Sequence, residues 1–100
     1  MNKIHIDIPA GLIEEFCRRH YIRRLAFFGS VLRDDFTPTS DIDVLVEFED
    51  SHIPGLGFFG MERELSEILK HKVDLNTLEF LSPLFRDEVL RAAKVQYDAA

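Results

Sequence analysis

The amino-acid sequence predicts an α/β (mixed α+β) domain with a small mixed β-sheet flanked by helices. Three segments carry apolar residues at intervals of three and four, the spacing of a helix with one buried face. Three short apolar runs between them have the length of strands. The chain has 100 residues, enough for one domain with a real core but not for two. We therefore expect one domain over residues 1–100, in the order helix, strand, loop, strand, helix, strand, helix.

The N-terminal quarter of the chain predicts a helix followed by a buried strand. A helix over about residues 9–20 follows from a proline suited to the first turn and from apolar residues at helical spacing, namely Leu12, Ile13, Phe16 and Cys17. Residues 24–28 are a short apolar run that ends at a glycine, which is typical of a buried strand. Cys17 is the only cysteine and cannot form an internal disulfide, so we interpret it as a packing residue.

A polar loop and a second strand come next. Residues 33–40 are polar and contain a proline, whereas residues 42–48 form a second predicted strand. Because side chains alternate along a strand, Asp41 and Asp43 share one face. The apolar residues at the even positions of this strand point to the opposite face and can pack on helices. Leu45 continues the face of the two aspartates, which is therefore a mixed face.

The C-terminal half predicts a helix, a strand and a second helix. A glycine-rich stretch precedes the first helix, whose apolar residues at helical spacing are Met61, Leu65, Ile68 and Leu69. Residues 72–76 are a short strand, and Ser82 is the predicted N-cap of a last helix that runs to about Ala93. We interpret the pair Phe58 and Phe59 as core, since aromatic side chains bury much area in so small a domain; an exposed partner surface is the alternative.

The composition limits the kinds of partner. Eighteen acidic against twelve basic side chains give a formal net charge of −6, which opposes the binding of a long nucleic acid through its phosphates. The N-terminal residues lack the apolar core of a signal peptide, and no stretch approaches the length of a membrane span. A lone cysteine fits a reducing compartment. We therefore expect a folded cytoplasmic protein that binds neither a membrane nor a long nucleic acid.

Residues with phosphate and metal chemistry stand at the ends or on the faces of the predicted strands: Gly29, Ser30, Asp41, Asp43 and Asp74. A glycine at the end of a strand lets backbone N–H groups approach phosphate oxygens, because no Cβ stands in the way. Ser30 adds a hydroxyl next to that glycine. Ten residues separate Ser30 from Asp41, and the strands on either side make a chance occurrence of this spacing rare.

The three aspartates form a candidate metal site. Two carboxylates on one strand face can bind a pair of Mg²⁺ ions, which prefer oxygen ligands and recruit phosphates as their remaining ligands. Asp74, from a later strand, would complete the second metal position and accept the proton of an attacking hydroxyl. The alternative interpretations are a solvated strand edge for Asp41 and Asp43 and an ordinary turn residue for Asp74.

This arrangement resembles the nucleotidyltransferase superfamily that shares a polymerase-β-like core. The signature of that superfamily is Gly-Ser, about ten residues, Asp-x-Asp and a distant third aspartate. Residues 27–48 and 72–75 look like its minimal, single-domain branch, which is found as antitoxins beside HEPN-domain toxins. The resemblance covers about residues 10–95 and implies the core fold of that superfamily.

The resemblance also implies an activity, cofactors and a partner. It implies transfer of AMP from the nucleoside triphosphate ATP to a hydroxyl, a tyrosine of a HEPN-type toxin. Two Mg²⁺ ions would be held by the carboxylates of Asp41, Asp43 and Asp74. Gly29 and Ser30 would hold the outer phosphates of the nucleotide.

Arg33 is a further candidate for phosphate binding. Its guanidinium group is expected either to steady the phosphates or to form an ion pair with Asp34 or Asp35. Members of the branch usually carry a glycine directly after this arginine, whereas this chain has two aspartates there. An extra acidic pair near a triphosphate repels it unless the side chains point outward.

Two other hypotheses remain open from the sequence. One is a binding module that neutralises its toxin by covering a surface, with a catalytically weak or inactive metal site; the short chain has little material to enclose a nucleotide base and an acceptor. The other is an enzyme with a sugar or antibiotic acceptor. Retention of the Gly-Ser pair and of all three aspartates favours the protein-modifying enzyme, because an unused carboxylate cluster only adds repulsion. The nucleotide base and the oligomeric state, a homo-oligomer included, stay open.

Overall fold

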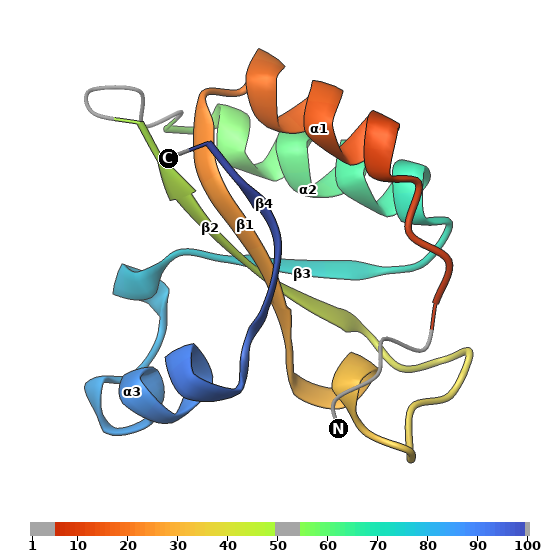
Figure 1. The fold of residues 1–100 in the computed structure, drawn as a ribbon, viewed down its shortest axis with the longest axis vertical. Coiled ribbons are helices and arrows are strands. Elements are labelled where there is room, and N and C mark those ends of the chain that lie inside the picture. The colour runs from red at the N-terminus through yellow and green to blue at the C-terminus, as the bar shows by residue number, and fades with distance from the viewer. Residues whose placement is uncertain (1–5, 50–54, 100) are drawn as a thin grey trace.

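One mixed β-sheet organises the fold in the computed structural model, which describes residues 6–49 and 55–99 (Figure 1). The strands lie in the order β3-β2-β1-β4. Their bounds are Ile22–Phe28 for β1, Ile42–Phe48 for β2, Val73–Asn76 for β3 and Lys94–Asp98 for β4. β1 pairs antiparallel with both β2 and β4, whereas β2 pairs parallel with β3. The prediction of a small mixed sheet flanked by helices is therefore confirmed.

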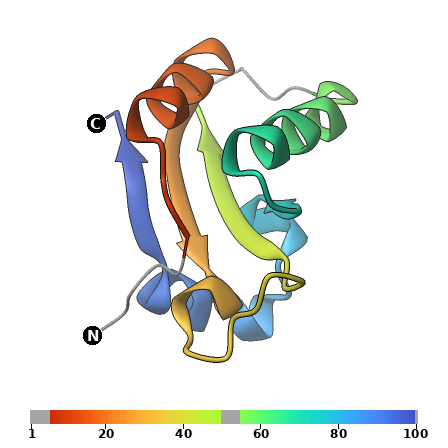
Figure 2. The same ribbon diagram turned by 90° about the vertical axis from the view of Figure 1, so that its right-hand side faces the viewer.

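The helices cover the two faces of the sheet unequally. α1 (Ala10–Arg19) and α2 (Gly57–Leu69) lie on one face, and the shorter cover on the other face is α3 (Pro83–Ala92) (Figures 1 and 2). Two 3₁₀ turns, η1 (Gly29–Leu32) and η2 (Leu78–Phe80), follow β1 and β3 respectively. No helix in the described part of the chain is both long enough and apolar enough to cross a membrane.

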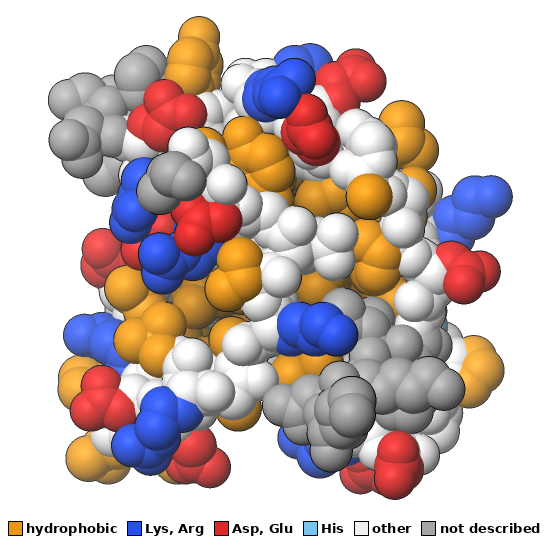
Figure 3. All heavy atoms as spheres, in the orientation of Figure 1, with side chains coloured by type: hydrophobic (Ala, Val, Ile, Leu, Met, Phe, Trp, Pro, Cys, Tyr) orange, Lys and Arg blue, Asp and Glu red, His pale blue; other side chains and the backbone are white. Residues whose placement is uncertain are grey.

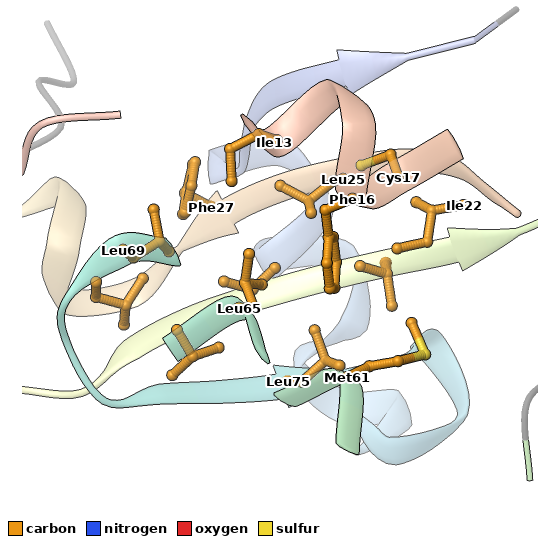
Figure 4. Close-up of a cluster of buried hydrophobic side chains, with 14 of the residues drawn as sticks. Ile13, Phe16, Cys17, Ile22, Leu25, Phe27, Met61, Leu65, Leu69 and Leu75 are labelled. Atoms are coloured by element: carbon orange, nitrogen blue, oxygen red, sulfur yellow. The ribbon is translucent and has the colours of Figure 1, made fainter. Parts of the chain in front are cut away.

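The core lies between the sheet and the helix pair α1 and α2. Every second residue of β2 is buried there, as the alternation predicted: Ile42, Val44 and Val46. Figure 4 shows side chains of α1, β1, α2 and β3 gathered in the same cluster, with Phe16 and Leu65 among them. Burial of a large apolar side chain contributes about 1.5–3 kcal/mol, so this layer supplies most of the stability of the domain.

The predicted helices and strands before residue 57 agree with the structure to within two residues, but α2 begins earlier than its apolar spacing indicates. It starts at Gly57, four residues before Met61. Phe58 accounts for the extra turn, because its side chain is buried and its ring meets that of Phe80 edge-on, with the centroids 5.3 Å apart. The earlier start therefore comes from a tertiary contact and not from local spacing.

The interpretation of the Phe58 and Phe59 pair as core is confirmed for one residue and wrong for the other. Phe58 is buried, whereas Phe59 is 69% exposed. Successive residues on an α-helix point about 100° apart, and in α2 this rotation directs Phe58 to the core and Phe59 to the solvent.

The strand β4 is missing from the predicted order of elements. Its residues have only two clear apolar side chains, Val95 and Tyr97, and Val95 is 49% exposed. The strand forms because β1 offers a backbone edge, with Leu25 facing Tyr97 and Ala26 facing Val95. α3 before it begins as predicted, with the side chain of Ser82 accepting a hydrogen bond from the Leu84 amide.

Cys17 is predicted to resist alkylation in the folded protein. The residue is fully buried in α1, and burial raises the pKa of its thiol to about 12. Since the thiolate is the reactive form, iodoacetamide at pH 8 should modify the native protein at least about 100-fold more slowly than the urea-unfolded protein. Mass spectrometry of timed samples measures both rates, and equal rates would contradict the buried position.

Candidate active site

Gly29 marks the point where β1 ends and its backbone approaches β2. Its φ angle is +75°, in the left-handed region that favours glycine. A Cβ atom built on it would lie 2.2 Å from Oδ2 of Asp43, far inside van der Waals contact. Both the conformation and the close approach require glycine here.

Ser30 connects this turn to the loop before β2. Its Oγ atom donates a hydrogen bond to the carbonyl oxygen of Asp41, 3.2 Å away, across eleven residues of sequence. The backbone of Arg33 closes η1 by donating to the carbonyl of Ser30 at 2.9 Å. The Gly-Ser pair and the first aspartate are therefore brought together in the structure.

Strand pairing places Asp43 between two neighbours of functional interest. In the antiparallel ladder it faces Phe28, the residue before Gly29, and in the parallel ladder it faces Asp74. Adjacent strands lie about 4.8 Å apart, so the carboxylates of Asp43 and Asp74 share one region of the sheet face. The residues flanking Asp74 in β3, Val73 and Leu75, are buried on the opposite face.

The charge cluster changes the ionisation of Asp43. Burial, followed by the charges of Asp74 and Asp41, raises the pKa of the Asp43 carboxyl from 3.8 to about 6, and Arg33 opposes this shift. A cation placed at the cluster would favour the ionised carboxylate, because opposite charge lowers the pKa. The electrostatics therefore favour a positively charged ligand at Asp43.

The three aspartates differ in their surroundings. Asp41 is exposed and its Oδ2 lies 3.8 Å from Nζ of Lys72, while Asp74 is exposed in β3. Among the described residues, no group of three or more His, Cys, Asp or Glu side chains is already arranged to hold a metal ion. The donor set still suits Mg²⁺, which takes oxygen ligands and usually keeps several waters beside one or two carboxylates and substrate phosphates.

Arg33 forms an ion pair with one of the aspartates that depart from the family pattern. Its Nε atom lies 3.3 Å from Oδ1 of Asp35, and both side chains are mostly exposed. Of the two predicted alternatives, the ion pair is present in this structure. An exposed pair of this kind contributes at most about 1 kcal/mol, so an anionic ligand can displace Asp35 from Arg33.

A cavity of about 430 Å³ adjoins the site and was not predicted. It lies between the end of β1 with η1 and one side of α3, and its lining residues are Phe28, Gly29, Leu32, Arg33, Phe85, Glu88, Val89 and Ala92. The four α3 residues follow the spacing i, i+3, i+4, i+7 of one helix face. That stripe was visible in the sequence, but the sequence does not show which element it faces.

Comparison with known proteins decides the family. Residues 10–95 match the nucleotidyltransferase domain family, with the Gly-Ser turn and the three aspartates inside the matched region. The chain belongs to this family. The prediction of a nucleotidyltransferase is therefore confirmed.

Individual relatives agree with this assignment. A Methanocaldococcus jannaschii protein provisionally named a protein adenylyltransferase is 37% identical over 75 residues, which cover 75% of this chain and 80% of the relative. A solved structure provisionally described as a minimal nucleotidyltransferase has a TM-score of 0.71 and 33% identity, covering 85% of this nucleotidyltransferase and 86% of that chain. These matches confirm the minimal nucleotidyltransferase branch.

A third comparison reports the same fold at lower identity. The structure is described as a tri-AMPylated Shewanella oneidensis HEPN toxin in complex with an MNT antitoxin. The match has a TM-score of 0.64 and 22% identity, and it covers 89% of this nucleotidyltransferase and 69% of that chain.

The substitution Asp43→Asn is predicted to stabilise the metal-free protein at high pH. Because folding raises the pKa of Asp43, the ionised carboxylate disfavours the folded state above pH 6 or so. The variant should gain on the order of 1 kcal/mol in the free energy of unfolding at pH 8, a value discounted because the group is only half-buried. The gain should shrink as the pH falls from about 6 and vanish below 3.8.

Urea denaturation in EDTA at several pH values measures this gain. Asp7→Asn is the matched control, since it removes one carboxylate from an exposed position outside the site. A gain of the same size in both variants, or one that does not depend on pH, would show that Asp43 is not strained by its neighbours.

The substitution Gly29→Ala is predicted to destabilise the protein by at least about 1 kcal/mol, because alanine disfavours the left-handed region and its Cβ would strike Asp43. Gly11→Ala in α1 is the control, since an added Cβ there meets nothing within 4 Å and should stabilise the helix by up to about 1 kcal/mol. In an Asp43→Ala background the cost of Gly29→Ala should fall. Chemical denaturation of wild type, the two single variants and the double variant gives the coupling free energy between positions 29 and 43. Strictly additive changes in the free energy of unfolding would contradict the contact.

Proposed function

We propose that this nucleotidyltransferase is a Mg²⁺-dependent protein adenylyltransferase that transfers AMP from ATP to a hydroxyl of a partner protein. The observation that carries the proposal is the position of Asp43, which lies against the glycine turn on one side and beside Asp74 on the other. Open backbone for phosphates and clustered carboxylates for a cation thus meet at one place. The adenylyl group is supported by the name of the M. jannaschii relative.

Each site residue has a role in this reaction. Gly29 and Ser30 hold the outer phosphates, and Arg33 exchanges Asp35 for a phosphate oxygen when the nucleotide binds. Asp41, Asp43 and Asp74 would hold two Mg²⁺ ions, which would neutralise the charge of the triphosphate and polarise its α-phosphoryl group. Burial and the neighbouring carboxylates of Asp74 and Asp41 oppose ionisation of Asp43 in the free protein. A bound cation would relieve this repulsion, which fits the proposed metal site.

The bonds that change are those at the α-phosphorus. The hydroxyl oxygen of the acceptor forms a bond to this phosphorus, the bond to the bridging oxygen breaks, and pyrophosphate leaves. Asp74 accepts the hydroxyl proton, since it is exposed on the same sheet face as Asp43.

The acceptor that we propose is a tyrosine of a HEPN-type toxin, which makes this chain an antitoxin acting in the cytoplasm, where ATP is available. Support comes from the fold shared with a complex that is described as an AMPylated HEPN toxin with an MNT antitoxin.

A second candidate is an antitoxin that neutralises its toxin by binding alone. The ion pair between Arg33 and Asp35 favours this binding-only candidate. The pair occupies the guanidinium group of Arg33, and it leaves a carboxylate near the proposed phosphate position. The two candidates differ in whether substitution of the aspartates changes the inhibition of the toxin.

The aspartates are predicted to divide between nucleotide binding and transfer. The variant Asp41→Asn/Asp43→Asn should lose the rise in melting temperature that ATP plus Mg²⁺ produces beyond either alone. Asp74→Asn should keep much of that rise, yet lose transfer by at least about 100-fold, because its proposed role is with the acceptor hydroxyl. Transfer is read as an AMP-sized mass gain on the HEPN-domain protein encoded beside this chain.

Asp7→Asn is the control and should behave as wild type in both assays. If wild type gives no mass gain but blocks the toxin stoichiometrically, and the aspartate variants block it equally well, the binding-only candidate replaces the enzyme. Absence of a neighbouring HEPN-domain gene would count against this acceptor.

A further inference from the structure

The segment formed by η2 and the start of α3 exposes large apolar side chains. Phe80, Leu84 and Phe85 fall within six consecutive residues and are 64%, 87% and 59% exposed. No side chain of α3 is buried by the rest of the described chain. Figure 3 shows hydrophobic side chains at the corner of the molecule where Figure 1 places α3. Such a concentration of exposed apolar residues on a small domain is typical of an interaction surface.

This surface, which we call the α3 patch and define as Phe80, Leu84 and Phe85, is continuous with the candidate active site. Phe85 also lines the cavity of about 430 Å³, and Gly29 lines the same cavity. Gly29 in turn lies against Asp43. The part of the patch in α3, Leu84 and Phe85, is on the face of the sheet opposite α1 and α2, which is the face of Asp43 and Asp74 (Figure 2). Phe80 in η2 meets the ring of Phe58 in α2.

The charges around the α3 patch indicate what kind of partner it fits. Beyond the patch, α3 carries two basic and two acidic side chains: Arg86, Asp87, Glu88 and Arg91. This balance gives no basic footprint for a nucleic acid, whose binding depends on phosphate neutralisation. Aromatic and aliphatic side chains with a mixed polar rim are instead the composition of a protein–protein interface.

We propose that the α3 patch is the surface on which the acceptor protein docks, so that its hydroxyl reaches Asp74 and Asp43 across the cavity. This inference rests on the proposed adenylyl transfer to a protein. It adds where that protein binds, and it explains why α3 leaves its apolar residues uncovered.

The variant Leu84→Arg tests the inference, because Leu84 is the most exposed residue of the patch and lines neither the cavity nor the aspartate cluster. Burying an unpaired charge in an interface should raise the KM for the HEPN-domain acceptor at least about tenfold, with kcat at saturating acceptor close to that of wild type. Leu84→Met keeps an apolar side chain and should have a KM close to that of wild type. The control Leu12→Arg changes a residue of α1 that is 52% exposed on the opposite face, and it should have no effect.

The readouts separate failure of this inference from failure of the proposed function. The stabilisation by ATP plus Mg²⁺, measured without acceptor, should be the same in all four proteins. If wild type transfers AMP and Leu84→Arg transfers it with an unchanged KM, the α3 patch is not the docking surface. If wild type binds ATP plus Mg²⁺ but transfers nothing, the enzymatic proposal fails. The docking surface would still be placed at α3 if Leu84→Arg, and neither of the other two variants, lost stoichiometric binding to the same HEPN-domain protein.

Discussion

The contact between the Gly29 backbone and the Asp43 carboxylate is the constraint on which the site depends. There the end of β1 lies close against the start of β2, and no residue with a Cβ fits without moving the carboxylate. The hydrogen bond from the Ser30 hydroxyl to the Asp41 carbonyl oxygen connects the turn after β1 to the residue that precedes β2. Because both contacts involve rigid strand ends, the phosphate-facing backbone and the carboxylates keep a common geometry.

The side chains of strand β2 alternate between its two faces, so one face contributes to the core and the other carries the site aspartate Asp43. Its residues Ile42, Val44 and Val46 are buried between the sheet and the helices α1 and α2, whereas Asp43 points to the other face. Burial, and then the like charges of Asp74 and Asp41, oppose ionisation of Asp43, and the apolar layer behind the strand offsets that cost. A strained carboxylate in the free protein is the state that a bound cation relieves. The sparse cover of α3 on the same face leaves that cation, the nucleotide and a partner room to approach.

Local patterns predicted much of this structure and failed where burial depends on distant partners. The strand at residues 42–48 and the Ser82 cap were predictable, because alternation and N-capping are set by neighbouring residues. β4 was not, since its few apolar residues become ordered only along the edge of β1. Phe58 and Phe59 looked alike in the sequence, and only the packing of α2 against η2 and the sheet buried the first and exposed the second.

The sequence by itself determined which chemical groups the site contains, because Gly29, Ser30 and the three aspartates are recognisable by type and spacing. Tertiary structure decided how these groups meet. Parallel pairing of β2 with β3 sets Asp74 beside Asp43 across thirty-one residues, and such non-local pairing is specified by the whole hydrophobic pattern and not by the motif. The raised pKa of Asp43, the ion pair of Arg33 and the uncovered side of α3 also depend on distances between segments, which a linear sequence does not contain.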